Sequence, residues 1–171
     1  MAILSSSLIN YENIYSQSHA NLFNLINNRS NIPDPANLSG SRKFIYVREP
    51  KIDSRNFEGF PLIIVPSFSI SQKENSADMT RAGMVYDIVV RVWTQDNSSD
   101  SSGNPNGAEQ LNTISDDIIQ TINANRKTLI NQGLMNFEMS SSDFDYDEID
   151  GKVVYIREFI FTFISRLRVA A

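Results

Sequence analysis

Residues 152–169, near the C-terminus of the chain, have the pattern of a strand that is apolar on both faces. Successive side chains of a strand point to opposite faces, so odd and even positions form two separate surfaces. The odd positions include Phe159, Phe161 and Phe163, which is typical of a core face. The even positions carry three isoleucines and a valine interspersed with charges. A strand with one side in water would be polar on that side, so we predict a core strand whose second face contacts another protein.

Four earlier segments also have strand patterns: residues 43–48, 60–70, 84–94 and 134–139. In the third of these, every even position from Met84 to Val92 is apolar, which predicts an inward face. Pro61 and Pro66 each remove a backbone donor, so we expect the second segment at a sheet edge or at a bulge. The polar residues 71–77 between the second and third segments predict the tip of a long β-hairpin.

Two segments have the period of a helix. Residues 4–26 carry apolar side chains at steps of three or four, and this stripe includes Leu22 and Ile26. A second helix is predicted to begin at Asn106, because Glu109 follows at the spacing of a capping box. Its expected buried stripe consists of Leu111, Ile114, Ile118 and Ile122. Gly133 supplies the stop signal.

The order of these elements predicts the fold class. We expect one α+β domain over residues 1–171, with a mostly antiparallel sheet, a long β-hairpin and two main helices packed on one sheet face. Both helices are expected to cover the face that carries Phe159, Phe161 and Phe163. Residues 71–77 and 96–107 are nearly all polar, so we expect mobile loops there.

Composition narrows the possible functions. The chain has 171 residues, of which 41% are hydrophobic, and 15 basic residues stand against 20 acidic ones for a formal charge of -5. Phosphate binding needs a concentrated basic surface, so a primary nucleic-acid binder is not expected. The sequence contains no cysteine. The first seven residues lack the features of a signal peptide, and no segment approaches the length of a membrane span, so we expect a soluble protein without membrane partners.

Candidate catalytic groups are sparse. The single histidine, His19, falls on the apolar stripe of the first helix, which favours a hydrogen-bonded packing residue over a chemical role. No serine lies in a nucleophile elbow, and the seven glycines form no phosphate-binding loop. We therefore expect neither an enzyme nor a cofactor or metal site.

The acidic residues between 143 and 150 allow several interpretations. Aspartates at 143, 145 and 147 imitate the start of an EF-hand loop, but Glu148 and Val154 stand where glycine and glutamate are needed. A solvated turn between two strands is the simplest interpretation. Alternatively, in a ring the same residues would form a negative surface that repels DNA or binds a basic partner.

Two groups of residues are candidates for an interface. Asp87, Arg91 and Trp93 share the odd face of residues 84–94, and tryptophan and arginine are enriched at interface hot spots. The even face of the last strand supplies the second group: Ile156, Glu158, Ile160 and Arg166. The alternative is that these charges are solvated and each contributes little.

The segment Phe60-Pro61-Leu62-Ile63-Ile64-Val65-Pro66 and the elements after it resemble a known family. It is similar to the strand that follows the first helix in the tail terminator proteins of long-tailed bacteriophages. A polar tip, the strand at 84–94, a polar loop, the helix with Glu109 and a long terminal strand follow in the same order. The resemblance covers roughly residues 3–168 and extends to head–tail joining and minor tail proteins.

This resemblance implies a structural role. Tail terminators form hexameric rings at the head-proximal end of the tail tube, where they stop its polymerisation and provide a surface for the neck. The implied partners are further copies of the chain, the tail tube protein and a neck or head-completion protein, with DNA passing only through the lumen. The implied location is the virion, and the host cytoplasm during assembly. Another neck or minor tail protein (a head–tail connector), a monomeric binding module and an enzyme with an unrecognised site are the alternatives.

Overall fold

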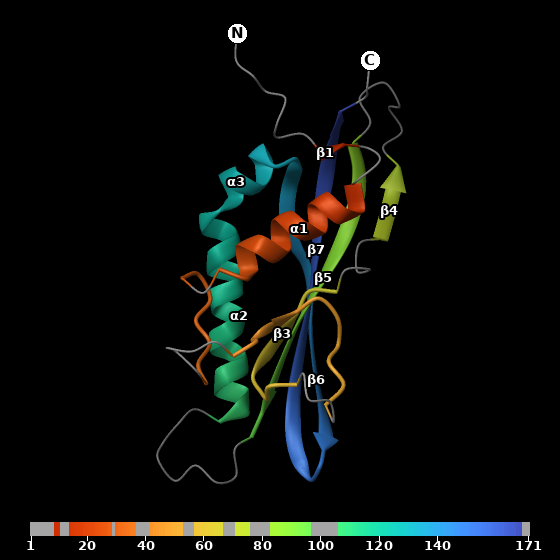
Figure 1. The fold of residues 1–171 in the computed structure, drawn as a ribbon. Helices are drawn as coiled ribbons and strands as arrows, with labels where there is room; N and C mark the ends of the chain where they lie inside the picture. Colours follow the sequence, from red (N-terminus) through yellow and green to blue (C-terminus); the bar gives the residue numbers. More distant parts are fainter. Residues whose placement is uncertain are drawn as a thin grey trace.

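A computed structural model describes residues 9–10, 14–28, 30–36, 42–52, 57–66, 71–75, 83–96 and 106–168. These residues form one sheet and three helices (Figure 1). The strands are β1 (Ile9–Asn10), β2 (Ile45–Tyr46), β3 (Leu62–Ile64), β4 (Ser71–Asn75), β5 (Gly83–Gln95), β6 (Leu134–Ile149) and β7 (Lys152–Arg168). The helices are α1 (Ile14–Ile26), α2 (Gly107–Ala124) and α3 (Arg126–Asn131).

Strand β7 is the centre of the sheet. It pairs antiparallel with β5 on one side and with β6 on the other, while β1 runs parallel to its end. Strand β5 in turn pairs antiparallel with β3 and β4, and β2 lies parallel to β3. The predicted α+β class with a mostly antiparallel sheet is therefore confirmed.

The main core lies between the sheet and the two longer helices. Phe159, Phe161 and Phe163 of β7 are buried there together with the even positions of β5 from Tyr86 to Val92. Helix α1 contributes Leu22 and Ile26, and α2 contributes its predicted stripe of Leu111, Ile114, Ile118 and Ile122. Both helices cover the same sheet face (Figure 1), as the sequence predicts.

The start of α2 is fixed against the end of β5. The side chain of Asn106 accepts a hydrogen bond from the backbone N–H of Glu109 at 2.9 Å, which confirms the predicted cap. Gly107 donates from its backbone N–H to Asp96, and Thr94 donates to the Gly107 carbonyl. A Cβ atom at Gly107 would lie 2.8 Å from the ring of Tyr155, so glycine permits this close approach.

Several predicted boundaries are wrong. The first helix begins at Ile14, because Ile9–Asn10 form β1 beside the end of β7; residues 1–8 lie outside the described part. Strand β3 covers only Leu62–Ile64 and lies between β2 and β5 rather than at an edge. Pro61 and Pro66 flank this strand and therefore remove none of its backbone donors. The Ile63 N–H, for example, donates to the Phe44 carbonyl.

The polar segments also differ from expectation. Ser71–Asn75 form β4 on β5 instead of a loop tip, and residues 76–82 lie outside the described part. Residues 97–105, which belong to the predicted loop at 96–107, also lie outside the described part. The acidic residues from Asp143 to Glu148 belong to β6. The turn to β7 consists of Asp150 and Gly151 alone, both with positive φ, as in a two-residue hairpin turn. The predicted antiparallel pairing with β5 is present in β3 and β4, and β6–β7 forms a further hairpin with longer strands.

We predict that Phe161→Ala lowers the free energy of unfolding by about 3–5 kcal/mol, because it leaves a cavity beneath both helices. Phe161 is 2% exposed and its ring stacks on Phe137 and Phe159. Chemical denaturation measures the change. Phe144→Ala is the matched control, since Phe144 lies on the same sheet face but is 54% exposed. Equal losses for both variants would contradict the assignment of the core.

We predict that Asn106→Ala lowers the free energy of unfolding by about 0.5–2 kcal/mol, because the first turn of α2 loses its cap. The same denaturation experiment measures it. Asn106→Asp keeps an acceptor oxygen and should retain nearly all of the stability. An alanine variant as stable as the aspartate variant would show that the cap contributes nothing.

Candidate functional site

The candidate interface residues of β5 and β7 lie on one surface. In the β5–β7 ladder, Arg91 pairs with Glu158 and Trp93 with Ile156. Directly paired residues point to the same side of a sheet. The two groups that the sequence suggests as separate surfaces therefore form a single face, opposite α1 and α2, which we call the open face. Arg166 belongs to β7 by its backbone, but its side chain is outside the described part.

Arg91 is held in place by two carboxylates. Its Nε donates to Glu158 on β7, and its Nη1 donates to Glu49. Burial lowers the pKa of Arg91, but the hydrogen bond and charge of Glu158, followed by those of Glu49, outweigh this effect and raise the pKa above its ordinary value. The guanidinium therefore stays charged and forms an ion pair across the β5–β7 ladder.

Trp93 packs within the subunit. It lies against a second buried cluster of Tyr46, Leu62 and Ile64, on the side of the sheet away from the main core. Its indole Nε1 is buried and has no hydrogen-bond partner. A buried unpaired N–H is costly, so the apolar contacts of the ring must outweigh it. This intramolecular packing accounts for Trp93 without a second protein, and an intermolecular role stays a prediction.

The rest of the open face mixes isoleucine with polar groups. Ile156 and Ile160 of β7 are partly exposed, and Ile160 pairs with Val89 of β5. Asp87 accepts a hydrogen bond from Thr162 across the same ladder. Asp143, Asp145 and Asp147 of β6 extend the face on its other side, because they pair with Glu158, Ile156 and Val154. The open face is therefore apolar at its centre and acidic along β6.

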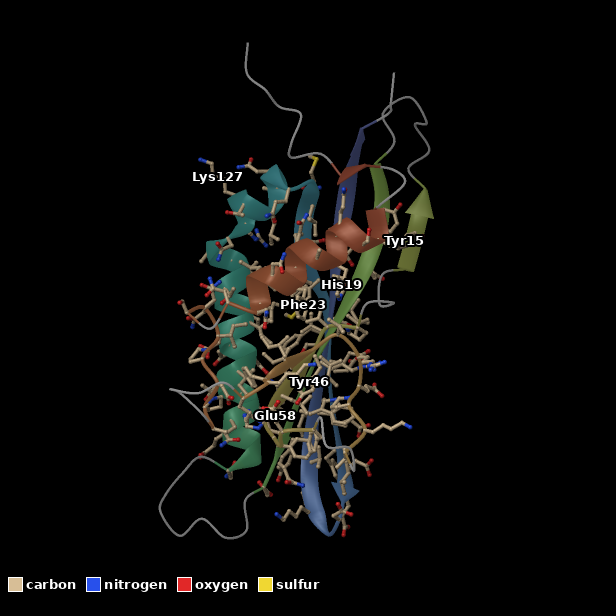
Figure 2. All side chains as sticks on the ribbon, viewed as in Figure 1. Tyr15, His19, Phe23, Tyr46, Glu58 and Lys127 are labelled. Carbon is tan, nitrogen blue, oxygen red and sulfur yellow. The ribbon has the colours of Figure 1, made fainter. Side chains whose placement is uncertain are left out.

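His19 has a packing environment. Its Nε2 lies 2.8 Å from the carbonyl oxygen of Val65, and its ring stacks on Phe23 at a centroid distance of 5.8 Å (Figure 2). A carbonyl oxygen only accepts, so Nε2 carries the proton in this contact. His19 thus ties α1 to the segment after β3.

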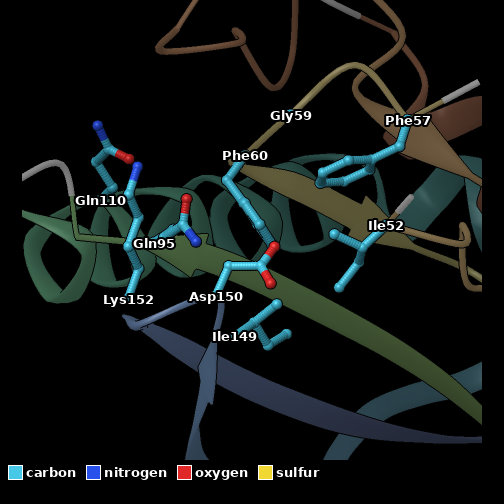
Figure 3. Close-up of a pocket in the computed structure, with 9 residues that line it drawn as sticks. All are labelled: Ile52, Phe57, Gly59, Phe60, Gln95, Gln110, Ile149, Asp150 and Lys152. Carbon is cyan, nitrogen blue, oxygen red and sulfur yellow. The ribbon is translucent and has the colours of Figure 1, made fainter. Parts of the chain in front are cut away.

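A pocket of about 350 Å³ lies between the residues before β3 and the β6–β7 turn (Figure 3). Phe57 and Phe60 form its apolar wall, while Gln95, Asp150 and Lys152 supply its polar groups. This arrangement can bind a small polar group but contains no activated nucleophile. Among the described residues, no group of three or more His, Cys, Asp or Glu side chains could hold a metal ion.

The sequence pattern did not predict a group of exposed apolar side chains on β6–β7. Met139, Phe144, Tyr146 and Val153 are 46%, 54%, 68% and 37% exposed, and we call them the aromatic patch. They lie on the sheet face opposite the aspartates of β6, because Phe144 pairs with Arg157 and Tyr146 with Tyr155. The signal was present: aspartate and aromatic residues alternate strictly from 143 to 147, which is the period of a strand.

No family model and no curated protein matches this chain. A chain from the virion of a native gene transfer agent (GTA) particle is similar to it in structure, with a TM-score of 0.36 and 13% sequence identity. The similarity covers 86% of this chain and 93% of that chain. A TM-score this low does not establish a shared fold, and the proposals below stand on the residues themselves. Within the described residues, no helix is long and apolar enough to cross a membrane.

We predict that a double-mutant cycle of Arg91→Ala and Glu158→Ala gives a coupling energy of about 1 kcal/mol or less. The two side chains are 31% and 30% exposed, so water screens the pair. Chemical denaturation of the four proteins measures the coupling, which should shrink when salt is added. A coupling well above about 1 kcal/mol, or one that does not change with salt, would contradict a solvent-screened pair.

Proposed function

We propose that this protein is a structural component of a phage-type particle that forms a homomeric ring at the head-proximal end of the tail tube. In this role it ends tube polymerisation and provides the surface to which the neck or head joins. The ring is proposed to be a hexamer and the protein to be non-catalytic. Its partners are then further copies of the chain, the tail tube protein and a neck protein, with DNA passing through the lumen.

The observation that carries this proposal is the open face. A sheet face with isoleucines at its centre, ion-paired Arg91 and a margin of aspartates is suited to a contact that excludes water and holds one register. The resemblance of the element order to tail terminators supports the same role. A chain with a net charge of -5 also suits a lumen through which DNA must pass without binding.

Ring closure requires that one surface of a subunit meet a different surface of the next. Because the candidates from β5 and β7 form one face, this face supplies one side of such a contact, or the surface that meets the tube. A head–tail connector is the second candidate function, and the same open face would serve it. The two roles differ in the fate of the tail: loss of a terminator gives tails of uncontrolled length, whereas loss of a connector gives tails of normal length without heads.

We predict that Ile160→Asp abolishes this activity while leaving the fold intact, because it places a charge at the centre of a partly exposed apolar surface. Particle assembly in cells that supply only the variant should give overlong tails, or tails without heads. Thr113→Asp, on the exposed side of α2, is the control and should give normal particles. Thermal melting of both purified variants verifies folding. Normal infectious particles from a folded Ile160→Asp protein would remove the open face from the proposal.

A further inference from the structure

The aromatic patch is the largest group of exposed apolar side chains among the described residues, and neither the core nor the open face accounts for it. It is rigidly supported, because Phe144 stacks on Tyr155 at a centroid distance of 6.4 Å. The Tyr155 hydroxyl in turn donates to Asp96 at 2.9 Å, and this bond, followed by burial and the charge of Asp96, raises the pKa of Tyr155. Ordered, exposed aromatic residues of this kind mark interaction sites in soluble proteins.

The charge around the patch restricts its partner. From Asp143 to Glu158, six acidic residues stand against two basic ones, Lys152 and Arg157. The turn end of the β6–β7 hairpin therefore carries most of the chain's formal charge of -5. A partner surface that is apolar and basic would be attracted to it.

Helix α3 offers such a surface. Ile130 is 50% exposed, and Arg126 and Lys127 on the same helix are exposed and take part in none of the described ion pairs. A pocket of about 270 Å³ lies beside them, lined by Arg126, Ile130, Asn136, Phe137 and Glu138. An aromatic ring in this pocket would contact Ile130 and Phe137 and would lie beside the guanidinium of Arg126, a favourable cation–π pairing.

The two surfaces cannot meet within one subunit. The pocket reaches Phe137 and Glu138 near the start of β6, whereas Phe144 and Tyr146 follow seven and nine residues after Phe137. At the rise of a strand this separates the two rings from Phe137 by roughly 20–30 Å, so they cannot enter the pocket of their own subunit. Lys127 and the β6–β7 turn accordingly lie at opposite ends of the molecule (Figure 2). A contact between them joins two copies head to tail, which is the heterologous type that closes rings.

We propose that the aromatic patch of one copy binds the α3 pocket of the next, with Tyr146 or Phe144 inserted beside Arg126 and Glu148, the carboxylate on the same sheet face as the patch, facing Lys127. This goes beyond the proposed function, because it uses surfaces outside the open face and predicts association of the isolated chain, whatever particle contains it. A competing basic and apolar surface exists at Val47, which is 40% exposed, with Arg48 and Lys51. It carries Glu49 among its cations, and the pocket that Ile52 lines beside it is already bordered by Ile149 and Asp150 at the β6–β7 turn of the same subunit.

Cysteine cross-linking tests the contact, since the chain has no cysteine of its own. Ser142 lies on the sheet face of the patch and Asn131 adjoins Ile130, and both are exposed. Ser142→Cys with Asn131→Cys in one chain, oxidised at high protein concentration, should give a ladder of dimers, trimers and larger species. Ser142→Cys with Val47→Cys is the matched control and should give no ladder. An absent ladder, a product limited to dimers, or an equal ladder from the control would overturn the proposal.

Charge reversal provides a second test with the same cysteines. Glu148→Lys makes the patch side of the hairpin basic, and Arg126→Glu with Lys127→Glu makes α3 acidic. In each reversed protein alone, the yield of cross-linked species should fall at least about tenfold, because like charges then face each other. A mixture of the two should recover it, since each reversed surface meets its complement on the other protein. The contact would also be overturned if the reversed proteins cross-linked when kept separate, or if their mixture gave no ladder.

Discussion

The antiparallel ladder between β5 and β7 is the constraint on which the rest of the structure depends. It runs from the pairing of Gly83 with Arg166 to the pairing of Gln95 with Val154, and it brings together segments about 70 residues apart in the sequence. One side of this ladder buries the phenylalanines of β7 under α1 and α2. Its other side is the open face, so a change of one residue in register would exchange core and surface. The ion pair of Arg91 with Glu158 spans this same ladder.

The sequence predicted what depends on local pattern. The period of α2, its cap at Asn106 and the aromatic face of β7 follow from neighbouring residues, and all three are confirmed. It did not predict features that depend on distant partners. Ile9 and Asn10 lie within the segment predicted to be helical but pair with the end of β7, and the polar residues of β4 form a strand because β5 offers a free edge.

The candidate site was predicted only in part. Alternation assigned Arg91 and Glu158 to outward faces, but it could not show that the two faces are one, because register between strands is not encoded in either strand alone. The acidic residues of β6 were assigned to a loop, since aspartate is rare in strands. Their pairing with β7 overrides that preference, and it also places Phe144 and Tyr146 on the exposed side of the hairpin.

The central claim is that the protein occupies the head-proximal end of a phage-type tail, and its location in the particle tests this most directly. A gold or fluorescent label on the chain, viewed by electron microscopy of intact particles, measures that location. The account predicts a single cluster of label at the junction of head and tail. Label spread along the tube, at the distal tip, or absent from the particle would contradict it.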